Sequence, residues 1–254
     1  MGISLASICK DPSVAPPRGV IYGPHGIGKT TFGAGAPSPI LMPLEEGWGT
    51  LATPRFPLLT TYAEVCEAIG ALYQDAHEYA TVIVDSLDWL EPLIWAETCA
   101  RHDKPDIEAW GYGKGYLYAC DVWREFLAGM SALREEKGMC ILLLAHAQVR
   151  SFNDPTNEPY DRYELKLQPR AAALIEEWAD IVGFANWRTY TTSTEVKKGV
   201  NKDKVTRGIG TGERLLHVEE RPGWRAKNRY SLPPEIPLSW QAFASALTPA
   251  APAA

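Results

Sequence analysis

The sequence predicts an α/β fold with a mostly parallel central sheet, helices on both faces and a C-terminal β-ribbon extension. Apolar runs of strand length alternate with helically spaced segments between Arg18 and Asn186, and such alternation is typical of a parallel sheet covered by helices. One of these runs leads into a glycine-rich loop, and a helix-forming segment follows that loop. The chain has 254 residues, 46% of them hydrophobic, which is enough for one large domain.

The first strand is predicted at residues 18–23 and the first helix at 29–34, with the glycine-rich loop between them. The loop has the spacing G-x-x-x-x-G-K-T and consists of Gly23, Pro24, His25, Gly26, Ile27, Gly28, Lys29 and Thr30. In this pattern backbone N–H groups surround phosphates, Lys29 reaches the β and γ oxygens, and Thr30 ligates magnesium. We therefore predict that the loop, together with Thr31, binds ATP and Mg²⁺. The alternative is an ordinary glycine turn, but a strand before and a helix after the loop favour the phosphate site.

The elements that follow are predicted from apolar spacing. Residues 39–44 form a short apolar strand that ends at two glutamates, and residues 81–85 (Thr-Val-Ile-Val-Asp) form a β-branched, buried strand. Helical spacing predicts helices at 62–76, 87–101 and 116–137, the last two separated by a glycine- and aromatic-containing stretch.

The second half of the chain begins with its clearest central strand. Residues 139–145 are apolar throughout and end at His146, and a polar loop at 151–162 follows them. A helix at 170–179 and a strand at 181–186 come next, and residues 187–230 have the pattern of a β-ribbon with a long polar loop. Small residues and prolines predict a flexible arm at 1–17, and the alanine-proline tail at 248–254 is predicted to be disordered. A single core thus spans residues 18–247.

Charge and cysteine content restrict the class of protein. The formal net charge is -6, yet residues 186–254 carry 11 lysines and arginines against 6 acidic residues, so basic character is concentrated in the last quarter. The five cysteines are widely spaced and predict neither a zinc site nor a disulfide framework. No signal peptide and no apolar run of membrane-spanning length is evident, so we expect a soluble, cytoplasmic protein with no membrane association.

Acidic residues at two strand ends are the candidates for metal binding and hydrolysis. Asp85 ends a buried strand, where a carboxylate can hold the magnesium shell, although it could instead cap the next helix. Glu45 and Glu46 follow the second strand, and a carboxylate there can orient the attacking water. We prefer Glu45, and the alternative is that both are solvated turn residues.

His146 and Gln148 are the candidates for sensing the γ-phosphate. His146 directly follows the central strand, so we expect it at the ligand edge of the sheet, where it can hydrogen-bond to phosphate or water. Gln148 can share that task. A histidine at this position can also be purely structural.

Several stretches together resemble the RecA-like core and, within it, the phage single-strand annealing ATPases often called the Sak-four group. Val84-Asp85-Ser86-Leu87 resembles the RecA-type Walker B segment, and a glutamate after the second strand resembles the RecA placement of the catalytic acid. The more specific similarity lies at 154–163, 167–180, 220–222, 226–230 and 232–240, and the resemblance as a whole covers residues 18 to about 247. Lys227-Asn228-Arg229-Tyr230 also looks like the K-N-R-F-G motif of the RadA/Sms recombination ATPase, from which Tyr230 and Ser231 depart.

The resemblance implies a protein that binds single-stranded DNA and promotes annealing or strand exchange in phage recombination, beside a single-strand-binding protein and in the host cytoplasm. It also implies a ring or filament in which Lys227 and Arg229 of one subunit complete the ATP site of the next. Without the resemblance, these two residues fit a solvated edge strand.

The DNA-contacting segments expected in such a core are 150–170 and 187–213. The second is predicted to be a flexible, basic, glycine-containing loop, and its DNA-binding candidates are Lys197, Lys198, Lys202, Lys204 and Arg207. Trp187, Tyr190 and Phe152 are candidates for stacking on bases. The alternative is a mobile surface loop without a partner. Other functions compatible with the motifs are a helicase-like or packaging motor, a small-molecule P-loop kinase, and a nucleotide-gated binding module.

Overall fold

The computed structural model describes residues 15–198 and 201–247, without the side chains of residues 191–198 and 201–209. Most of the predicted N-terminal arm and the predicted disordered tail at 248–254 therefore lie outside the described residues. Within them, one sheet of nine strands forms the centre of the molecule, with the order β2-β3-β4-β1-β6-β7-β9, and with β5 paired to β4 and β8 to β6.

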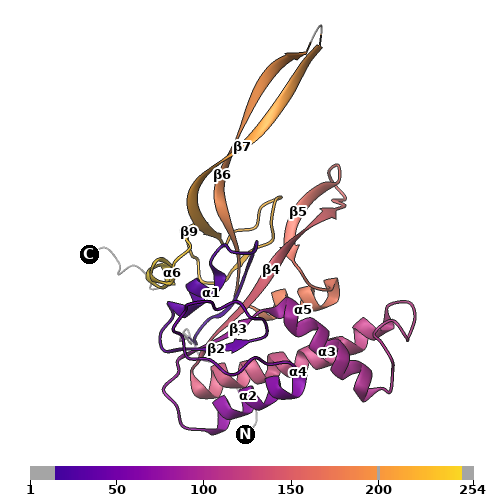
Figure 1. The fold of residues 1–254 in the computed structure, drawn as a ribbon, viewed down its shortest axis with the longest axis vertical. Coiled ribbons are helices and arrows are strands. Elements are labelled where there is room, and N and C mark those ends of the chain that lie inside the picture. Colours follow the sequence, from indigo (N-terminus) through magenta and orange to yellow (C-terminus); the bar gives the residue numbers. More distant parts are fainter. Residues whose placement is uncertain (1–14, 199–200, 248–254) are drawn as a thin grey trace, which may run out of the picture.

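Five strands of the sheet run parallel to one another (Figure 1). They are β1 (Arg18–Gly23), β2 (Pro39–Pro43), β3 (Thr81–Asp85), β4 (Cys140–Phe152) and β6 (Ile181–Lys198). The register pairs Gly23 with His146, Leu144 with Asp85, and Asp85 with Pro43. The glycine loop, Asp85, His146 and the segment after β2 therefore all lie at the carboxyl edge of the sheet, where ligands of α/β proteins bind.

Helices cover both faces of the sheet because neighbouring residues of each strand point to opposite sides. On one face, Val20 and Tyr22 pack in a cluster with residues of α2 (Tyr62–Gln74), α3 (Leu87–Arg101), α4 (Lys114–Lys137) and α5 (Pro169–Trp178). On the other, Ile21 packs with residues of α1 (Lys29–Ala34) and α6 (Trp240–Leu247). The predicted α/β fold is confirmed, although α6 has no counterpart among the predicted elements.

Two antiparallel hairpins extend the sheet beyond the predicted strands. The first joins β4 to β5 (Tyr160–Leu165), and the second joins β6 to β7 (Asn201–His217). Both project to the same side of the molecule (Figure 1). The short strands β8 (Lys227–Asn228) and β9 (Glu235–Pro237) pair with β6 and β7.

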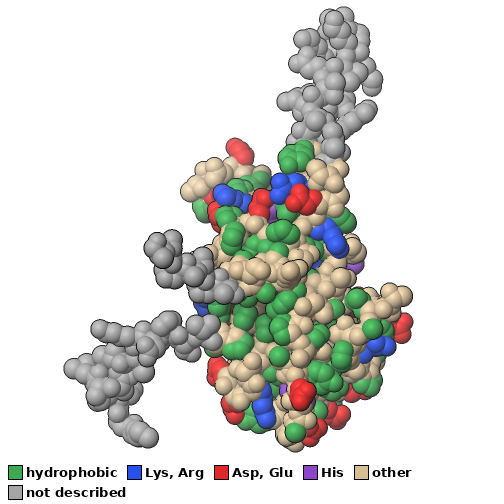
Figure 2. Space-filling view, turned by 90° about the vertical axis from the view of Figure 1, so that its left-hand side faces the viewer, with side chains coloured by type: hydrophobic (Ala, Val, Ile, Leu, Met, Phe, Trp, Pro, Cys, Tyr) green, Lys and Arg blue, Asp and Glu red, His purple; other side chains and the backbone are tan. Residues whose placement is uncertain are grey.

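These hairpins correct two loop predictions. Residues 151–162 include the end of β4 and the start of β5, so only 153–159 form the connection between them. Residues 187–213 run as two paired strands rather than as a long loop, with 199–200 outside the described residues. Exposed strands need no apolar alternation to pair their backbones, which explains why the polar sequence suggested loops. In Figure 2, Lys, Arg, Asp and Glu side chains gather where this ribbon meets the body of the molecule.

Candidate functional site

The glycine loop between β1 and α1 has the backbone of a phosphate-binding loop. Gly26 and Gly28 have φ values of 70° and 104°, a region that favours glycine. The Lys29 side chain is buried, and its Nζ donates to the carbonyls of Gly23 and Pro24 at 3.2 and 3.1 Å. Burial lowers the pKa of the Lys29 ammonium. The ammonium is thus held across the loop, in position to meet an anionic ligand.

Thr30 and Asp85 meet directly at the base of the loop. The Thr30 Oγ1 donates to Asp85 Oδ2 at 2.7 Å, and Asp85 is only 6% exposed. Burial raises the pKa of the Asp85 carboxyl, an effect opposed by the hydrogen bond from Thr30. The structure thus brings together the two predicted magnesium ligands, a hydroxyl and a carboxylate, from α1 and β3.

Glu45 reaches the same place from the end of β2. Pairing of the strands continues past β2, because the Leu44 N–H donates to the Asp85 carbonyl at 2.7 Å. The Ser86 hydroxyl then donates to Glu45 Oε1 at 3.0 Å. Glu45 is half-buried, whereas Glu46 is exposed and does not line the cleft. The geometry therefore favours Glu45 over its neighbour.

His146 is tied to the site by hydrogen bonding and by ring stacking. Its backbone N–H donates to Asp88 Oδ1 at 3.0 Å, and its Nδ1 lies 2.8 Å from Asp88 Oδ2. Although burial favours the neutral acid, these contacts lower the pKa of Asp88 to about 2. The His146 ring stacks on His25 of the glycine loop with centroids 3.8 Å apart. Asp88, which the sequence did not single out, thus fixes the orientation of the His146 ring.

These residues enclose one cleft of about 500 Å³. Its lining includes His25, Lys29, Thr30, Glu45, Asp85 and His146. The segment from Gly47 to Leu51, which the sequence did not single out, forms another part of the wall. Gln148 is not among the residues that line this cleft. Its amide donates to the Leu165 carbonyl at 2.7 Å, beside the β4–β5 hairpin.

Comparison with known proteins shows to which family the chain belongs. A protein-family model described as "AAA domain" matches residues 15–230, most of the chain. The chain belongs to this AAA domain family. Among solved structures, a crystal structure of the RadB recombinase matches with a TM-score of 0.46 and 13% identity over 90% of both chains. No curated protein matches the chain. The family match thus indicates a P-loop ATPase domain, and the cleft contains its glycine loop.

The residues of this AAA domain fit Mg²⁺ as well as nucleotide. Mg²⁺ prefers oxygen ligands and is usually held by one or two carboxylates together with water and phosphate oxygens. Thr30 Oγ1 and Asp85 Oδ2 supply a hydroxyl and a carboxylate side by side. No group of three or more histidine, cysteine or acidic side chains suited to a metal occurs in the part of the chain that the structure describes.

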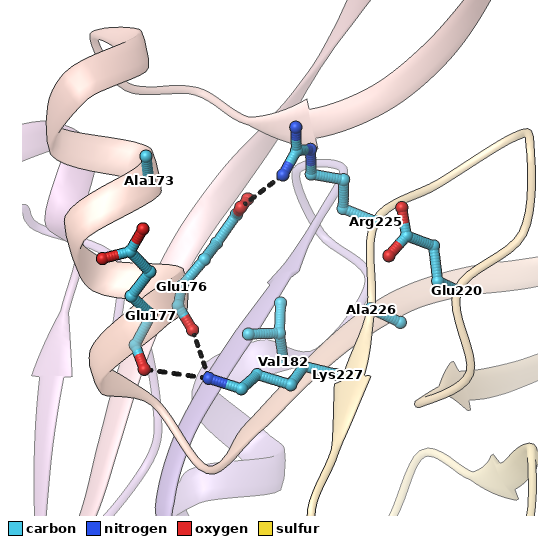
Figure 3. A pocket seen from close by; sticks show the side chains of 8 residues that line it. All are labelled: Ala173, Glu176, Glu177, Val182, Glu220, Arg225, Ala226 and Lys227. Atoms are coloured by element: carbon cyan, nitrogen blue, oxygen red, sulfur yellow. Dashed lines mark hydrogen bonds and ion pairs between the residues drawn. The ribbon is translucent and has the colours of Figure 1, made fainter.

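Lys227 and Arg229 of the AAA domain lie at the opposite edge of the sheet. β8 pairs with the beginning of β6, at Ile181 and Val182. Lys227 Nζ donates to the carbonyls of Glu176 and Glu177 at 2.8 and 2.9 Å and so caps the end of α5 (Figure 3). Arg229 contacts Asp180 at 3.3 Å while its side chain remains 53% exposed. Neither residue can reach the nucleotide cleft of its own chain.

The predicted DNA-binding residues lie on the β6–β7 ribbon. Lys197 and Lys198 belong to β6, and Lys202, Lys204 and Arg207 to β7, with their side chains outside the described residues. Of the predicted stacking residues, Trp187 and Tyr190 are exposed near the root of the ribbon. Phe152 is instead covered by the guanidinium of Arg162, 3.7 Å from the ring centroid.

One contact to the glycine loop was missed by sequence reasoning. Arg214 of β7 donates from Nη1 to the Ile27 carbonyl at 3.3 Å. No local pattern marks this arginine, because 187 residues separate it from its partner. None of the described helices is long and apolar enough to cross a membrane.

Proposed function

We propose that this protein hydrolyses ATP with Mg²⁺ and uses the nucleotide to handle single-stranded DNA, by annealing or strand exchange in phage recombination. The observation that carries the ATPase part is the convergence of Lys29, the Thr30–Asp85 pair and Glu45 on one cleft. Lys29 and Thr30 come from α1, Asp85 ends β3, and Glu45 lies just after β2; together they supply a cation, a magnesium site and a carboxylate.

Each side chain has a distinct task in the proposed hydrolysis. The Lys29 ammonium stabilises negative charge on the terminal phosphates. The Thr30 hydroxyl and the Asp85 carboxylate hold the metal ion, which supplies further charge neutralisation when bound. The Glu45 carboxylate, oriented by the Ser86 hydroxyl at 3.0 Å, positions the attacking water. His146, held by Asp88, is placed to respond to the phosphate end of the ligand.

The DNA part of the proposal is supported by the two hairpins. They contain the predicted DNA-contacting segments, and both project to the same side of the molecule (Figure 1). The β6–β7 ribbon has a lysine- and arginine-rich sequence, which suits a phosphate backbone, and exposed Trp187 and Tyr190 near its root can stack on bases. Backbone contacts carry no sequence information, so we expect no sequence preference.

DNA binding and annealing can be measured directly. Wild type is expected to bind a labelled oligonucleotide in fluorescence anisotropy and to anneal complementary strands. The quadruple alanine variant of Lys197, Lys198, Lys202 and Lys204 is expected to lose DNA affinity while it keeps ATP binding. A control variant replaces three lysines away from the ribbon, Lys104, Lys114 and Lys137, which lie on or beside α3 and α4. Unchanged DNA affinity in the quadruple variant would overturn the ribbon assignment.

Two other outcomes would replace the proposed function. Displacement of a strand from a forked duplex without annealing would indicate a helicase-like motor. Transfer of phosphate to a small acceptor in place of water would indicate a kinase. Stimulation of annealing by a single-strand-binding protein tests the proposed partner.

We also propose that the protein acts as a ring or filament in which Arg229 completes the cleft of the next subunit. Arg229 is half exposed, on the edge opposite its own cleft, so it is available to a neighbouring copy. Lys227 is more firmly engaged, because two carbonyls hold its ammonium.

Mixing two variants tests this arrangement. Lys29→Ala lacks a working cleft but retains Arg229, whereas Arg229→Ala has the reverse defect. Each variant alone is expected to be inactive, and their mixture is expected to recover part of the hydrolysis. Arg221→Ala, which removes an exposed arginine paired with Glu219, serves as the control. Failure of the mixture to recover activity, with each variant folded, would contradict a shared site.

A further inference from the structure

At the root of the β6–β7 ribbon, the Arg214 side chain contacts the outside of the phosphate loop. Arg214 lies in β7 opposite Trp187 of β6. Its Nη1 donates to the Ile27 carbonyl at 3.3 Å. A Cβ atom on Gly28 would lie only 2.5 Å from the same Nη1. A side chain at 28 would therefore push the end of the Arg214 side chain aside, and the φ of 104° separately favours glycine there.

The contact with Arg214 determines the orientation of the Ile27–Gly28 peptide. The Ile27 carbonyl and the Gly28 N–H belong to the same planar trans peptide, so they point in opposite directions. In phosphate loops the backbone N–H groups face the anion. Because Arg214 donates to the Ile27 carbonyl from outside the loop, it keeps the Gly28 N–H pointing into the loop, where a phosphate would bind.

The backbone that carries Arg214 is itself well anchored. The Leu238 N–H donates to the Arg214 carbonyl at 2.9 Å, and Leu215, the next residue, pairs with Pro237 of β9. The root of the ribbon is thus held beside β9, and from there the Arg214 guanidinium reaches the phosphate loop.

We propose that Arg214 is a positioning residue that holds the Ile27–Gly28 peptide in its phosphate-binding orientation and thereby couples the β6–β7 ribbon to the nucleotide site. The inference rests on nucleotide binding, one part of the proposed function, and it does not need DNA. Coupling of this kind is reciprocal: whatever orders the ribbon root tightens nucleotide binding, and the nucleotide orders the ribbon root to the same extent.

The experiment compares Arg214→Ala with Arg188→Ala, a matched loss of an arginine from the same ribbon root. Binding of a non-hydrolysable ATP analogue, without DNA, is expected to weaken about fivefold in Arg214→Ala, the loss of one hydrogen bond. Arg188→Ala is expected to bind like wild type, because its partners are Glu213 and Glu235. Arg214→Lys, which can still donate to the carbonyl, is expected to recover part of the affinity.

Hydrogen exchange provides a second measurement that a merely structural role would not change. In wild type and Arg188→Ala, the analogue is expected to slow exchange of the amides at 186–189 and 213–216, and in Arg214→Ala this protection is expected to disappear. Equal affinity in Arg214→Ala and wild type, or protection that persists in Arg214→Ala, would overturn the inference and leave the ATPase proposal intact. Absence of analogue binding by wild type would overturn both.

Discussion

Two buried aspartates at opposite edges of the same sheet behave in opposite ways. Asp85 at the carboxyl edge is 6% exposed and Asp180 at the amino edge is 5% exposed. Burial alone raises the pKa of both carboxyls, and for Asp85 the pKa stays raised, since its closest partner is the Thr30 hydroxyl. For Asp180 the pKa ends below its usual value, because Arg18 hydrogen-bonds to both of its oxygens.

The difference separates a functional edge from a structural one. Asp180 is surrounded by Arg18 at 2.9 Å, Arg229 at 3.3 Å and Arg134 at 3.6 Å, so the chain itself neutralises its charge. Among the described residues, no guanidinium contacts Asp85, which faces a cleft of about 500 Å³ and feels the charge of Lys29 across it. A buried carboxylate without a close ion pair suits a cation delivered with a ligand.

The largest effect on hydrolysis is expected when one of two similarly bonded lysines, one at each edge of the sheet, is replaced by alanine. Lys29 and Lys227 both donate to two backbone carbonyls. Lys29→Ala is expected to reduce hydrolysis by at least about 100-fold and to weaken ATP binding, because a cation is lost at the transferred phosphate. Lys227→Ala is expected to lower the free energy of unfolding by about 1 kcal/mol and to leave ATP binding intact. Phosphate release, calorimetric nucleotide titration and urea unfolding measure the three quantities.

A sharper test within the functional edge compares two adjacent glutamates. Glu45→Gln is expected to lower kcat about 100-fold or more while nucleotide binding is kept, because the amide cannot take a proton from water. Glu46→Gln is expected to change kcat less than about twofold, since Glu46 is exposed and outside the cleft. Single-turnover hydrolysis and analogue binding distinguish the two variants. A larger loss in Glu46→Gln would reverse the assignment.

Replacement of Asp180, at the structural edge, should lower the free energy of unfolding more than replacement of Asp85. Asp180→Ala is expected to lower the free energy of unfolding by about 3 kcal/mol, because it leaves the part-buried guanidinium of Arg18 without its partner. Asp85→Ala is expected to have a much smaller effect on stability and to abolish Mg²⁺-dependent hydrolysis. Urea unfolding at neutral pH measures both. If Asp85→Ala proves the more destabilising, the distinction between the edges fails.

The sequence allowed prediction of the parts of the site that a local pattern encodes. The glycine loop, Lys29, Thr30 and Asp85 are marked by spacing within a strand, a loop and a helix, and the predicted bounds of β1, α1, β3 and α3 agree with the structure. Glu45 required only the rule that parallel strands end at the ligand edge.

What could not be predicted depends on contacts between distant segments. Arg214 meets the glycine loop only because β7 pairs with β6, which lies beside β1. The contact between Asp88 and His146 could not be predicted either, because nothing in the local sequence of Asp88 indicates that this part of β4 lies beside it. The ribbon was predicted in part as a loop, because exposed paired strands lack the apolar alternation that marks buried ones.

The smallest effect is expected at a third buried carboxyl, which belongs to neither edge network. Glu91 of α3 is 7% exposed, and its two oxygens accept the Gln168 N–H at 3.0 and 3.1 Å. Burial raises the pKa of Glu91 to about 7, although Gln168 and the charge of Arg150 oppose this and Asp88 adds to it. In the unfolded chain the proton leaves near pH 4.5, about 2.5 units lower.

Between these two values the folded state binds more protons than the unfolded state, so stability should fall as the pH rises from about 4.5 to 7 and then level off. We expect this group to account for a loss of roughly 1 to 3 kcal/mol over that range. Glu91→Gln, whose side-chain carbonyl can still accept the Gln168 N–H, is expected to remove this part of the pH dependence. Glu67→Gln, at an exposed position, is the control. Urea unfolding at several pH values between 4.5 and 8 measures the slope. A slope that persists in Glu91→Gln would mean that a group other than Glu91 titrates in this range. Glu91 would then give no support to the view that burial without a neighbouring cation raises a carboxyl pKa, which is how the contrast between Asp85 and Asp180 is explained.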